Sequence, residues 1–305
     1  MFATLLHDKI LEKNSRLCVG LDPRIEWIPT SLTDTARQEF GDTFDAAGAA
    51  IFLFNKQVID RVAPLVPAVK PQIAFYEQYG IPGLIAFQKT VAYAKEQGLV
   101  VIIDAKRGDI DSTAAAYANT FGGSTQLFGS EQTAFPGIDC VTVNPFLGKD
   151  SLDPFVEMSH NYGSGLFILV KTSNPGSKDL QDSSLGERTV TQEVADWVAA
   201  YASEKLDDRG YSNIGAVVGA TFPEEARMLR ERMPHSIFLV PGLGSQGGGY
   251  EGLGNFFDQE GLGAVINSSR GITFSQRGEE GSDWLDIIEH NTREAVANIN
   301  QAIGK

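Results

Sequence analysis

The segment LVVIIDAKRGDIDST, residues 99–113, changes abruptly from apolar to charged. Its first five residues are apolar and rich in Val and Ile, as expected for a strand that is buried on both faces. Asp104, Lys106 and Asp109 follow at once. The segment therefore predicts a buried strand that carries charged side chains to its carboxyl end.

Segments of the same kind recur along the chain, with helix-like segments between them. The alternation predicts a parallel sheet with right-handed crossovers. Eight such units favour an α/β fold of the (β/α)₈ TIM-barrel type, built as one domain over residues 1–305, with an open doubly wound sheet as the alternative. The predicted strands are residues 17–22, 68–75, 99–106, 140–145, 165–173, 214–221, 237–244 and 264–271, and the predicted helices are residues 43–62, 82–97, 189–206, 223–233 and 283–303.

Composition excludes several classes of protein. The net charge of −14 argues against non-specific binding to nucleic acid or to an anionic membrane surface. The chain contains no apolar stretch of membrane-spanning length, and its first residues lack the apolar core of a signal peptide. Cys18 and Cys140 lie in apolar runs, so we expect buried core residues without a disulfide, in a reducing, cytoplasmic location.

The charges after residue 103 are expected to form a cluster. Residues two apart in a strand point the same way, so Asp104 and Lys106 share one side, and Gly108 permits a turn that returns Asp109 towards it. Lys70 lies in the neighbouring predicted strand and is a natural partner for Asp104, since buried charges are costly unless paired. A structural ion-pair network is the alternative, but catalytic residues gather at the carboxyl ends of barrel strands.

An anion site is predicted after the last two strands. PGLGSQGGG (241–249) offers backbone N–H groups and Gln246, and NSSRG (267–271) offers Arg270, whose forked cation suits phosphate oxygens. Loops in these positions form the common phosphate site of barrels. A local cationic pocket would allow an acidic protein to bind an anion. Asp22 ends the first strand ahead of Pro23, where a simple turn is the alternative.

Two insertions, residues 122–137 and 174–187, are rich in Gly, Ser, Thr and Gln. Loops that follow barrel strands form the active face, so residues 174–187 are a candidate lid. An exposed surface excursion is the equally available interpretation.

The motif Asp104-x-Lys106-x-x-Asp109-Ile110-x-x-Thr113 resembles the signature of the orotidine 5′-monophosphate decarboxylase family. Further similarity covers nearly the whole chain, in GLDPR (20–24), VKPQIAFYEQYG (69–80), KTSNPGS (171–177) and the two anion-site segments. The second-strand segment is similar to that of the longer, bacterial-type branch of the family, whereas the two insertions depart from the compact family pattern. Pro-Gln after Lys70, in place of the commoner small residues, is a second departure from that pattern.

The resemblance implies a carboxy-lyase that converts orotidine 5′-monophosphate into uridine 5′-monophosphate and CO₂ in de novo pyrimidine biosynthesis. It implies no metal, flavin, pyridoxal or other cofactor. Lys106 would stabilise and then protonate the C6 carbanion, Asp104 would lie beside the departing carboxylate, and Lys70 would hold Asp104 and contact the ribose. The substrate contacts implied are Asp22 to the ribose, Ser173 to the pyrimidine, and Gln246 and Arg270 to the phosphate.

The resemblance also implies a homodimer with shared active sites. Asp109 would reach into the site of the neighbouring subunit, with Ile110 and Thr113 close to the same boundary.

Two rival functions are weaker. Magnesium-dependent sugar-phosphate decarboxylases and aldolases of the same superfamily share the Asp-x-Lys-x-x-Asp array but carry a glutamate ligand on the second strand. Lys70 takes that position here and would repel the metal ion. A catalytically silent phosphate-binding barrel is disfavoured because all four charged residues are present.

Overall fold

The computed structural model describes residues 1–221, 223–243, 249–274 and 284–305. Eight parallel strands close into a barrel, in the order β1-β12-β11-β10-β7-β6-β3-β2, as the alternating pattern predicts. Valine, isoleucine and leucine dominate these strands because both faces are covered. The barrel strands are β1 (Leu17–Leu21), β2 (Ala68–Pro71), β3 (Val100–Arg107), β6 (Cys140–Val143), β7 (Gly165–Lys171), β10 (Ser212–Val218), β11 (Ser236–Val240) and β12 (Ala264–Ser268).

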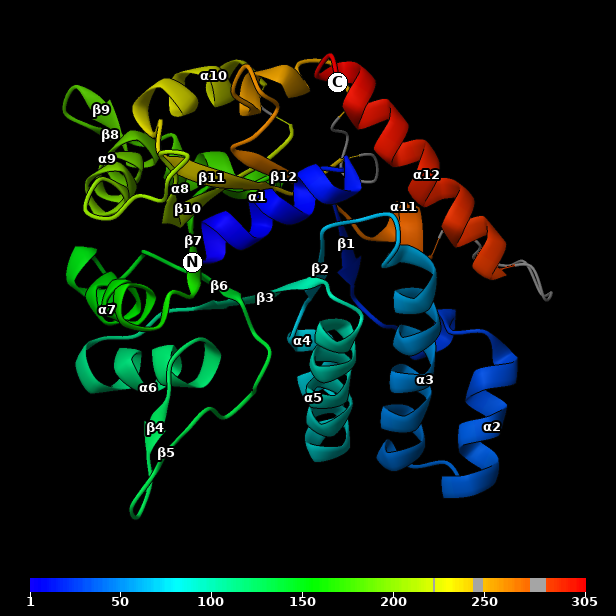
Figure 1. The fold of residues 1–305 in the computed structure, drawn as a ribbon. Helices are drawn as coiled ribbons and strands as arrows, with labels where there is room; N and C mark the ends of the chain where they lie inside the picture. The colour runs from blue at the N-terminus through cyan, green and yellow to red at the C-terminus, as the bar shows by residue number, and fades with distance from the viewer. Residues whose placement is uncertain (222, 244–248, 275–283) are drawn as a thin grey trace.

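Helices surround the barrel and pack on its outward-facing side chains (Figure 1). All five predicted helices are present to within a few residues. The outer helices are α3 (Phe44–Val62), α5 (Gly80–Glu96), α6 (Asp111–Phe121), α7 (Asp153–Tyr162), α9 (Val190–Ala202), α10 (Pro223–Arg232) and α12 (Trp284–Ala302), and α2 (Thr30–Phe40) packs beside α3. None of the described helices is both long enough and apolar enough to cross a membrane.

Several predicted strands extend past the carboxyl ends of the observed ones, and two of them run into helices. The strand predicted as residues 68–75 ends at Pro71, followed only by a single bridge between Gln72 and Asp104, and α4 (Ala74–Glu77) begins soon after. The segment predicted as residues 264–271 ends at Ser268, and α11 (Arg270–Thr273) begins with the arginine of the predicted anion site. Both changes occur at the active face, where apolar periodicity gives way to loop residues.

Helix α1 (Phe2–Lys13) closes the amino-terminal end of the barrel. Phe2, Leu6 and Ile10 are buried in one cluster with inward-facing strand residues, among them Cys18 and Cys140. The Phe2 ring meets Phe167 edge-on at 5.7 Å. Both cysteines are free and buried, as predicted. Figure 1 shows α1 (blue) crossing in front of the strands.

The two insertions lie at different ends of the barrel. Residues 122–137 follow a helix, α6, and contain the short hairpin of β4 (Thr125–Gln126) and β5 (Glu131–Gln132), which projects away from the body in Figure 1. Residues 174–187 follow a strand, β7, at the active face. They contain η3 (Pro175–Ser177), α8 (Lys178–Gln181) and β8 (Ser184–Leu185), which pairs with β9 (Arg188–Thr189).

Candidate active site

A cavity of about 560 Å³ opens where the barrel strands end. Six residues predicted from the sequence line it together: Asp22, Lys70, Asp104, Lys106, Ser173 and Arg270. They come from the ends of five strands or the turns that follow them. Closing the sheet into a barrel is what brings these distant segments around one space.

Asp104 is held between two ammonium groups. The Nζ of Lys70 donates to one carboxylate oxygen at 2.7 Å, and the Nζ of Lys106 donates to the other. The Lys70 side chain is 5% exposed, whereas that of Lys106 is 43% exposed and reaches into the cavity. Lys70 therefore serves as a buried anchor, and Lys106 is the accessible cation of the pair.

Thr142, on the neighbouring strand β6, completes the support of Asp104. Its hydroxyl donates to the Asp104 carboxylate at 3.1 Å and accepts from the backbone N–H groups of Ala105 and Lys106 at 3.0 and 2.9 Å. The end of β3 and its carboxylate are thus fixed by one side chain. Sequence reasoning missed Thr142, although a lone hydroxyl in an apolar strand was an available signal.

The charged forms of these groups stabilise one another. Burial alone would raise the pKa of Asp104, but Lys70 and Lys106 outweigh it and lower that pKa well below its usual range. Burial alone would lower the pKa of Lys70, but Asp104 and Asp22 outweigh it and raise that pKa. Asp104 and Lys70 are therefore both ionised at neutral pH.

The backbone of Lys106 is strained. Its φ of 48° lies in the left-handed region, which residues other than glycine rarely adopt. The Thr142 contact to its N–H holds this conformation. Strain of this kind persists where surrounding structure fixes a residue for a purpose.

Asp22, directly after β1, has a carboxylate oxygen that is available to accept a hydrogen bond. Its Oδ1 is buried and has no hydrogen-bond partner within the described parts of the chain. Burial raises the pKa of Asp22 and outweighs the opposite effects of Lys70 and the Ser269 hydroxyl. Ser269 can approach because Gly20 lacks a side chain: a Cβ there would lie 1.8 Å from the Ser269 hydroxyl. The carboxyl group is thus placed to accept from a ligand hydroxyl.

Ser173 lies in a segment that is braced from outside the barrel. Thr172 donates its backbone N–H to Gln181 of α8 at 2.9 Å, and Gln181 donates back to the Thr172 hydroxyl at 2.8 Å. Gly219 makes room on the other side, since a Cβ there would come within 2.9 Å of the Ser173 backbone.

Three predicted residues do not line this cavity. Asp109, Ile110 and Thr113 lie at and after the turn that follows β3, and Asp109 accepts from the N–H of Ile110 at 2.8 Å. The expected return of Asp109 towards Asp104 and Lys106 is therefore not seen within one chain. Gly108 is required instead by its close approach to Asn144, whose carbonyl would lie 2.9 Å from a Cβ. Gln246 lies outside the described residues.

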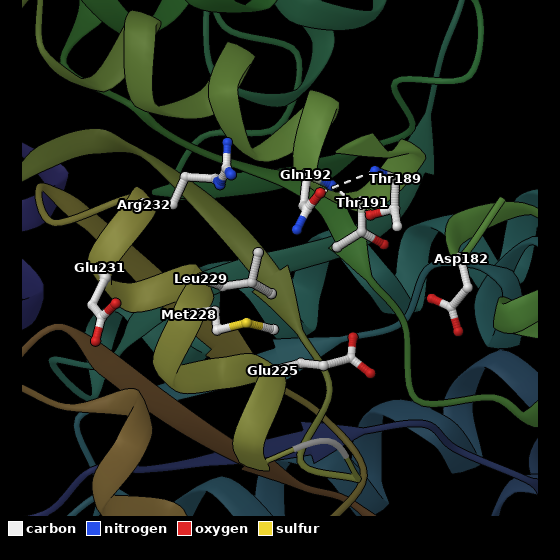
Figure 2. Close-up of a pocket in the computed structure, with 9 residues that line it drawn as sticks. All are labelled: Asp182, Thr189, Thr191, Gln192, Glu225, Met228, Leu229, Glu231 and Arg232. Carbon is white, nitrogen blue, oxygen red and sulfur yellow. Dashed lines mark hydrogen bonds between the residues drawn. The ribbon is translucent and has the colours of Figure 1, made fainter. Parts of the chain in front are cut away.

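A second pocket of similar volume, about 560 Å³, lies outside the barrel between α9 and α10 (Figure 2). Asp182 and Glu225 extend towards each other from its walls. The buried ammonium of Lys171 bridges them, pairing with Asp182 and lying 3.3 Å from Glu225. No predicted site residue is among the residues drawn around this pocket, so we assign the chemistry to the cavity inside the barrel.

Comparisons with known proteins agree on one family. The sequence profile described as "Orotidine 5′-phosphate decarboxylase / HUMPS family" matches residues 15–282. A protein of Rhodopirellula baltica named orotidine 5′-phosphate decarboxylase is 47% identical, over 99% of this chain and 98% of its own length. One of the same name from Caldicellulosiruptor bescii is 40% identical, over 99% of each chain. The structure of Leishmania donovani OMP decarboxylase superposes with a TM-score of 0.75 at 30% identity, over 100% of this chain and 99% of that one.

Proposed function

The chain belongs to the orotidine 5′-phosphate decarboxylase family, and on that premise we propose how its barrel cavity performs the reaction. The reaction is the decarboxylation of orotidine 5′-monophosphate to uridine 5′-monophosphate and CO₂. The chain is therefore a carboxy-lyase of pyrimidine biosynthesis. The observation that carries the proposed mechanism is a carboxylate, Asp104, fixed between a buried and an accessible ammonium group.

Lys106 is the proposed proton donor. With the C6 carboxylate of the substrate beside Asp104 and Lys106, loss of CO₂ leaves an electron pair on C6. The Lys106 ammonium stabilises that carbanion and then transfers a proton to it. Because its side chain is 43% exposed, Lys106 can recover a proton from solvent after product release.

The remaining cavity residues bind the nucleotide. The unsatisfied oxygen of Asp22 suits a ribose hydroxyl, and Ser173 is assigned to the pyrimidine. Arg270, at the start of α11, is assigned to the phosphate, and the same role is assigned to Gln246 from the sequence motif alone. The phosphate lies far from the reacting carbon, but its binding energy can orient the ring and favour the transition state.

A homodimer with shared sites is the proposed assembly. Asp109 does not line the cavity of its own chain, so it is available to a second one. Ile110 follows Asp109 directly, Phe146 and Leu147 follow the neighbouring strand β6, and these three side chains are 50%, 71% and 50% exposed. Exposed apolar clusters of this kind mark interfaces. We also infer a cytoplasmic location, which the two free, buried cysteines support.

The magnesium-dependent alternative fits the site poorly. Both oxygens of Asp104 already accept hydrogen bonds from ammonium groups, which leaves little of their capacity to coordinate a divalent cation. No cluster of three potential ligands able to hold a metal ion occurs among the described residues.

Turnover by the purified protein tests the function. The ultraviolet absorbance of orotidine 5′-monophosphate should change over time when the protein is added, and the rate of this change should not depend on a chelator. The magnesium-dependent alternative predicts that a chelator abolishes the activity. Lys106→Ala should lower kcat by more than about 10⁴-fold, because stabilisation and proton donation are both removed. It should leave binding of uridine 5′-monophosphate measurable, and Lys56→Ala, an exposed lysine on α3, controls for lost charge. No turnover by wild type at any protein concentration would overturn the function, and near-normal turnover by Lys106→Ala would overturn the role.

A further inference from the structure

Arg24 lines the barrel cavity, although neither the sequence motifs nor the proposed mechanism assigns it a role. It lies two residues after Asp22, just beyond the end of β1. We propose that Arg24 is a second anion-binding residue of the cavity, which takes the 5′-phosphate of the substrate beside Arg270. The inference rests on the proposed function and adds a specificity residue to it.

Aromatic rings hold the guanidinium of Arg24 in place. Its central carbon stands 4.4 Å from the centroid of the Trp27 ring and 4.8 Å from that of Phe75. Rings stacked on a guanidinium cover its faces and leave the N–H donors at its edge. Those donors form a planar fork that matches two oxygens of one anion. The side chain is thus ordered before a ligand arrives, which reduces the entropy lost on binding.

Arg24 differs from the two lysines of the cavity in its pairing. Lys70 and Lys106 both donate to Asp104. Across the described part of the chain, Arg24 makes neither an ion pair nor a hydrogen bond through its side chain. A cavity arginine without a carboxylate, in a protein of net charge −14, indicates that its counter-ion is supplied from outside the chain.

The packing of Arg24 places it on the phosphate side of the cavity. Strand β1 pairs with β12, with Val19 opposite Ser268. Trp27, one of the two rings under Arg24, meets Phe274 edge-on at 5.2 Å, and Phe274 directly follows the α11 helix that Arg270 begins. The loop that carries Arg24 and the helix that carries Arg270 therefore form one packed unit. A phosphate dianion held by this unit could take one charge-assisted contact from each arginine.

A comparison of two ligands tests the proposal. Binding of uridine 5′-monophosphate and of uridine is measured by calorimetry for wild type, Arg24→Gln, Arg24→Lys and Arg37→Gln, together with kcat and KM for orotidine 5′-monophosphate. Arg37 is an exposed arginine of α2 outside the cavity lining, so it controls for the lost charge. Arg24→Gln should weaken the binding of uridine 5′-monophosphate about tenfold or more and the binding of uridine less than about twofold. Arg24→Lys should recover part of the loss, and Arg37→Gln should match wild type.

Each contrary result has a distinct meaning. An equal loss of affinity for both ligands would mean that Arg24 contacts the nucleoside or supports folding, and it would overturn the proposal. So would unchanged affinity for the monophosphate. Dissociation of a dimer by Arg24→Gln, with monophosphate affinity retained at high protein concentration, would show that the anion is a carboxylate of a second copy. Absence of decarboxylation by wild type would instead count against the function itself, since the binding comparison needs no turnover.

Discussion

At the residue scale, Asp104 gathers three donors, and each fixes a different property. Lys70 neutralises it from the buried side, Thr142 orients it, and Lys106 presents a proton beside it to the cavity. The lysines could be predicted from the sequence because strand alternation and barrel adjacency bring them to Asp104. Thr142 could not, because its contact depends on the register that sets Ile103 opposite Val141.

His7, on α1, is a buried histidine that favours its neutral form. Both ring nitrogens lack a hydrogen-bond partner in the described parts of the chain, and the ring meets Tyr211 edge-on at 4.7 Å. Burial lowers the pKa of His7 to about 4, and Arg209 also lowers it, against the opposing effects of Asp207, Asp258 and Asp8. Between that value and its ordinary pKa of 6.5, the unfolded chain binds a proton that the folded chain does not.

The contribution of neutral His7 to the free energy of unfolding should therefore be fully present above the unfolded-state pKa and should be lost as the pH falls from 6.5 towards 4. From about pH 7.5 to about pH 4.5, His7 should account for roughly 2–3 kcal/mol of the lost free energy of unfolding. Urea unfolding of wild type and His7→Phe at the two pH values measures this share as the difference between their pH dependences. His290→Gln, an exposed histidine of α12, should behave like wild type. Parallel losses in wild type and His7→Phe would contradict the assignment.

At the element scale, the end of β7 is tied to its surroundings by one lysine. Lys171 is 0% exposed and bridges Asp182, after α8, to Glu225 of α10. Lys171→Met would leave two carboxylates facing each other without a cation. We expect a loss of about 2 kcal/mol in stability, less than for a fully buried pair because both carboxylates are partly exposed. KM for orotidine 5′-monophosphate should also rise, since Ser173 is only two residues away.

The control for this change is Lys178→Met, an exposed lysine of α8. Urea unfolding and steady-state kinetics are measured for both variants. If Asp182→Asn and Glu225→Gln are added to Lys171→Met, the repulsion is removed and part of the stability should return. A Lys171→Met protein as stable as the Lys178→Met protein would show that the bridge contributes nothing.

The strands and the larger helices could be predicted because each has a strong apolar period. The ends of β2 and β12 could not, because the sequence shows no clear stop at Pro71 and Ser268, where these strands end. Helices α6 and α7 were not predicted, since their apolar faces are short and mixed with polar residues. Closure of the sheet depends on contacts between β1 and β12, which are far apart in the sequence.

At the scale of the whole molecule, the proposed shared site can be tested by mixing two inactive chains. Lys106→Ala lacks the proton donor, and Asp109→Ala lacks the residue offered to the neighbour. In a hybrid dimer, one site combines an intact Lys106 with an intact Asp109 from the other chain. A random equal mixture should then recover about a quarter of wild-type activity, because half of the dimers are hybrids with one competent site each.

Subunit exchange is verified with two affinity tags, and activity is followed as exchange proceeds. Either variant mixed with itself should remain inactive. A mixture that exchanges completely but recovers no activity would place Asp109 outside the shared site or the site within one chain.

Side chains of helix α1 and of the barrel strands close the amino-terminal end of the barrel. Phe2, Leu6 and Ile10 cover this end, so the active-site cavity does not open through the amino-terminal end of the barrel. Substrate enters, and nucleotide product leaves, by the same mouth. The nucleotide product must therefore leave the cavity before a second substrate molecule can enter it. Accumulated product thus competes for the entrance as well as for the site.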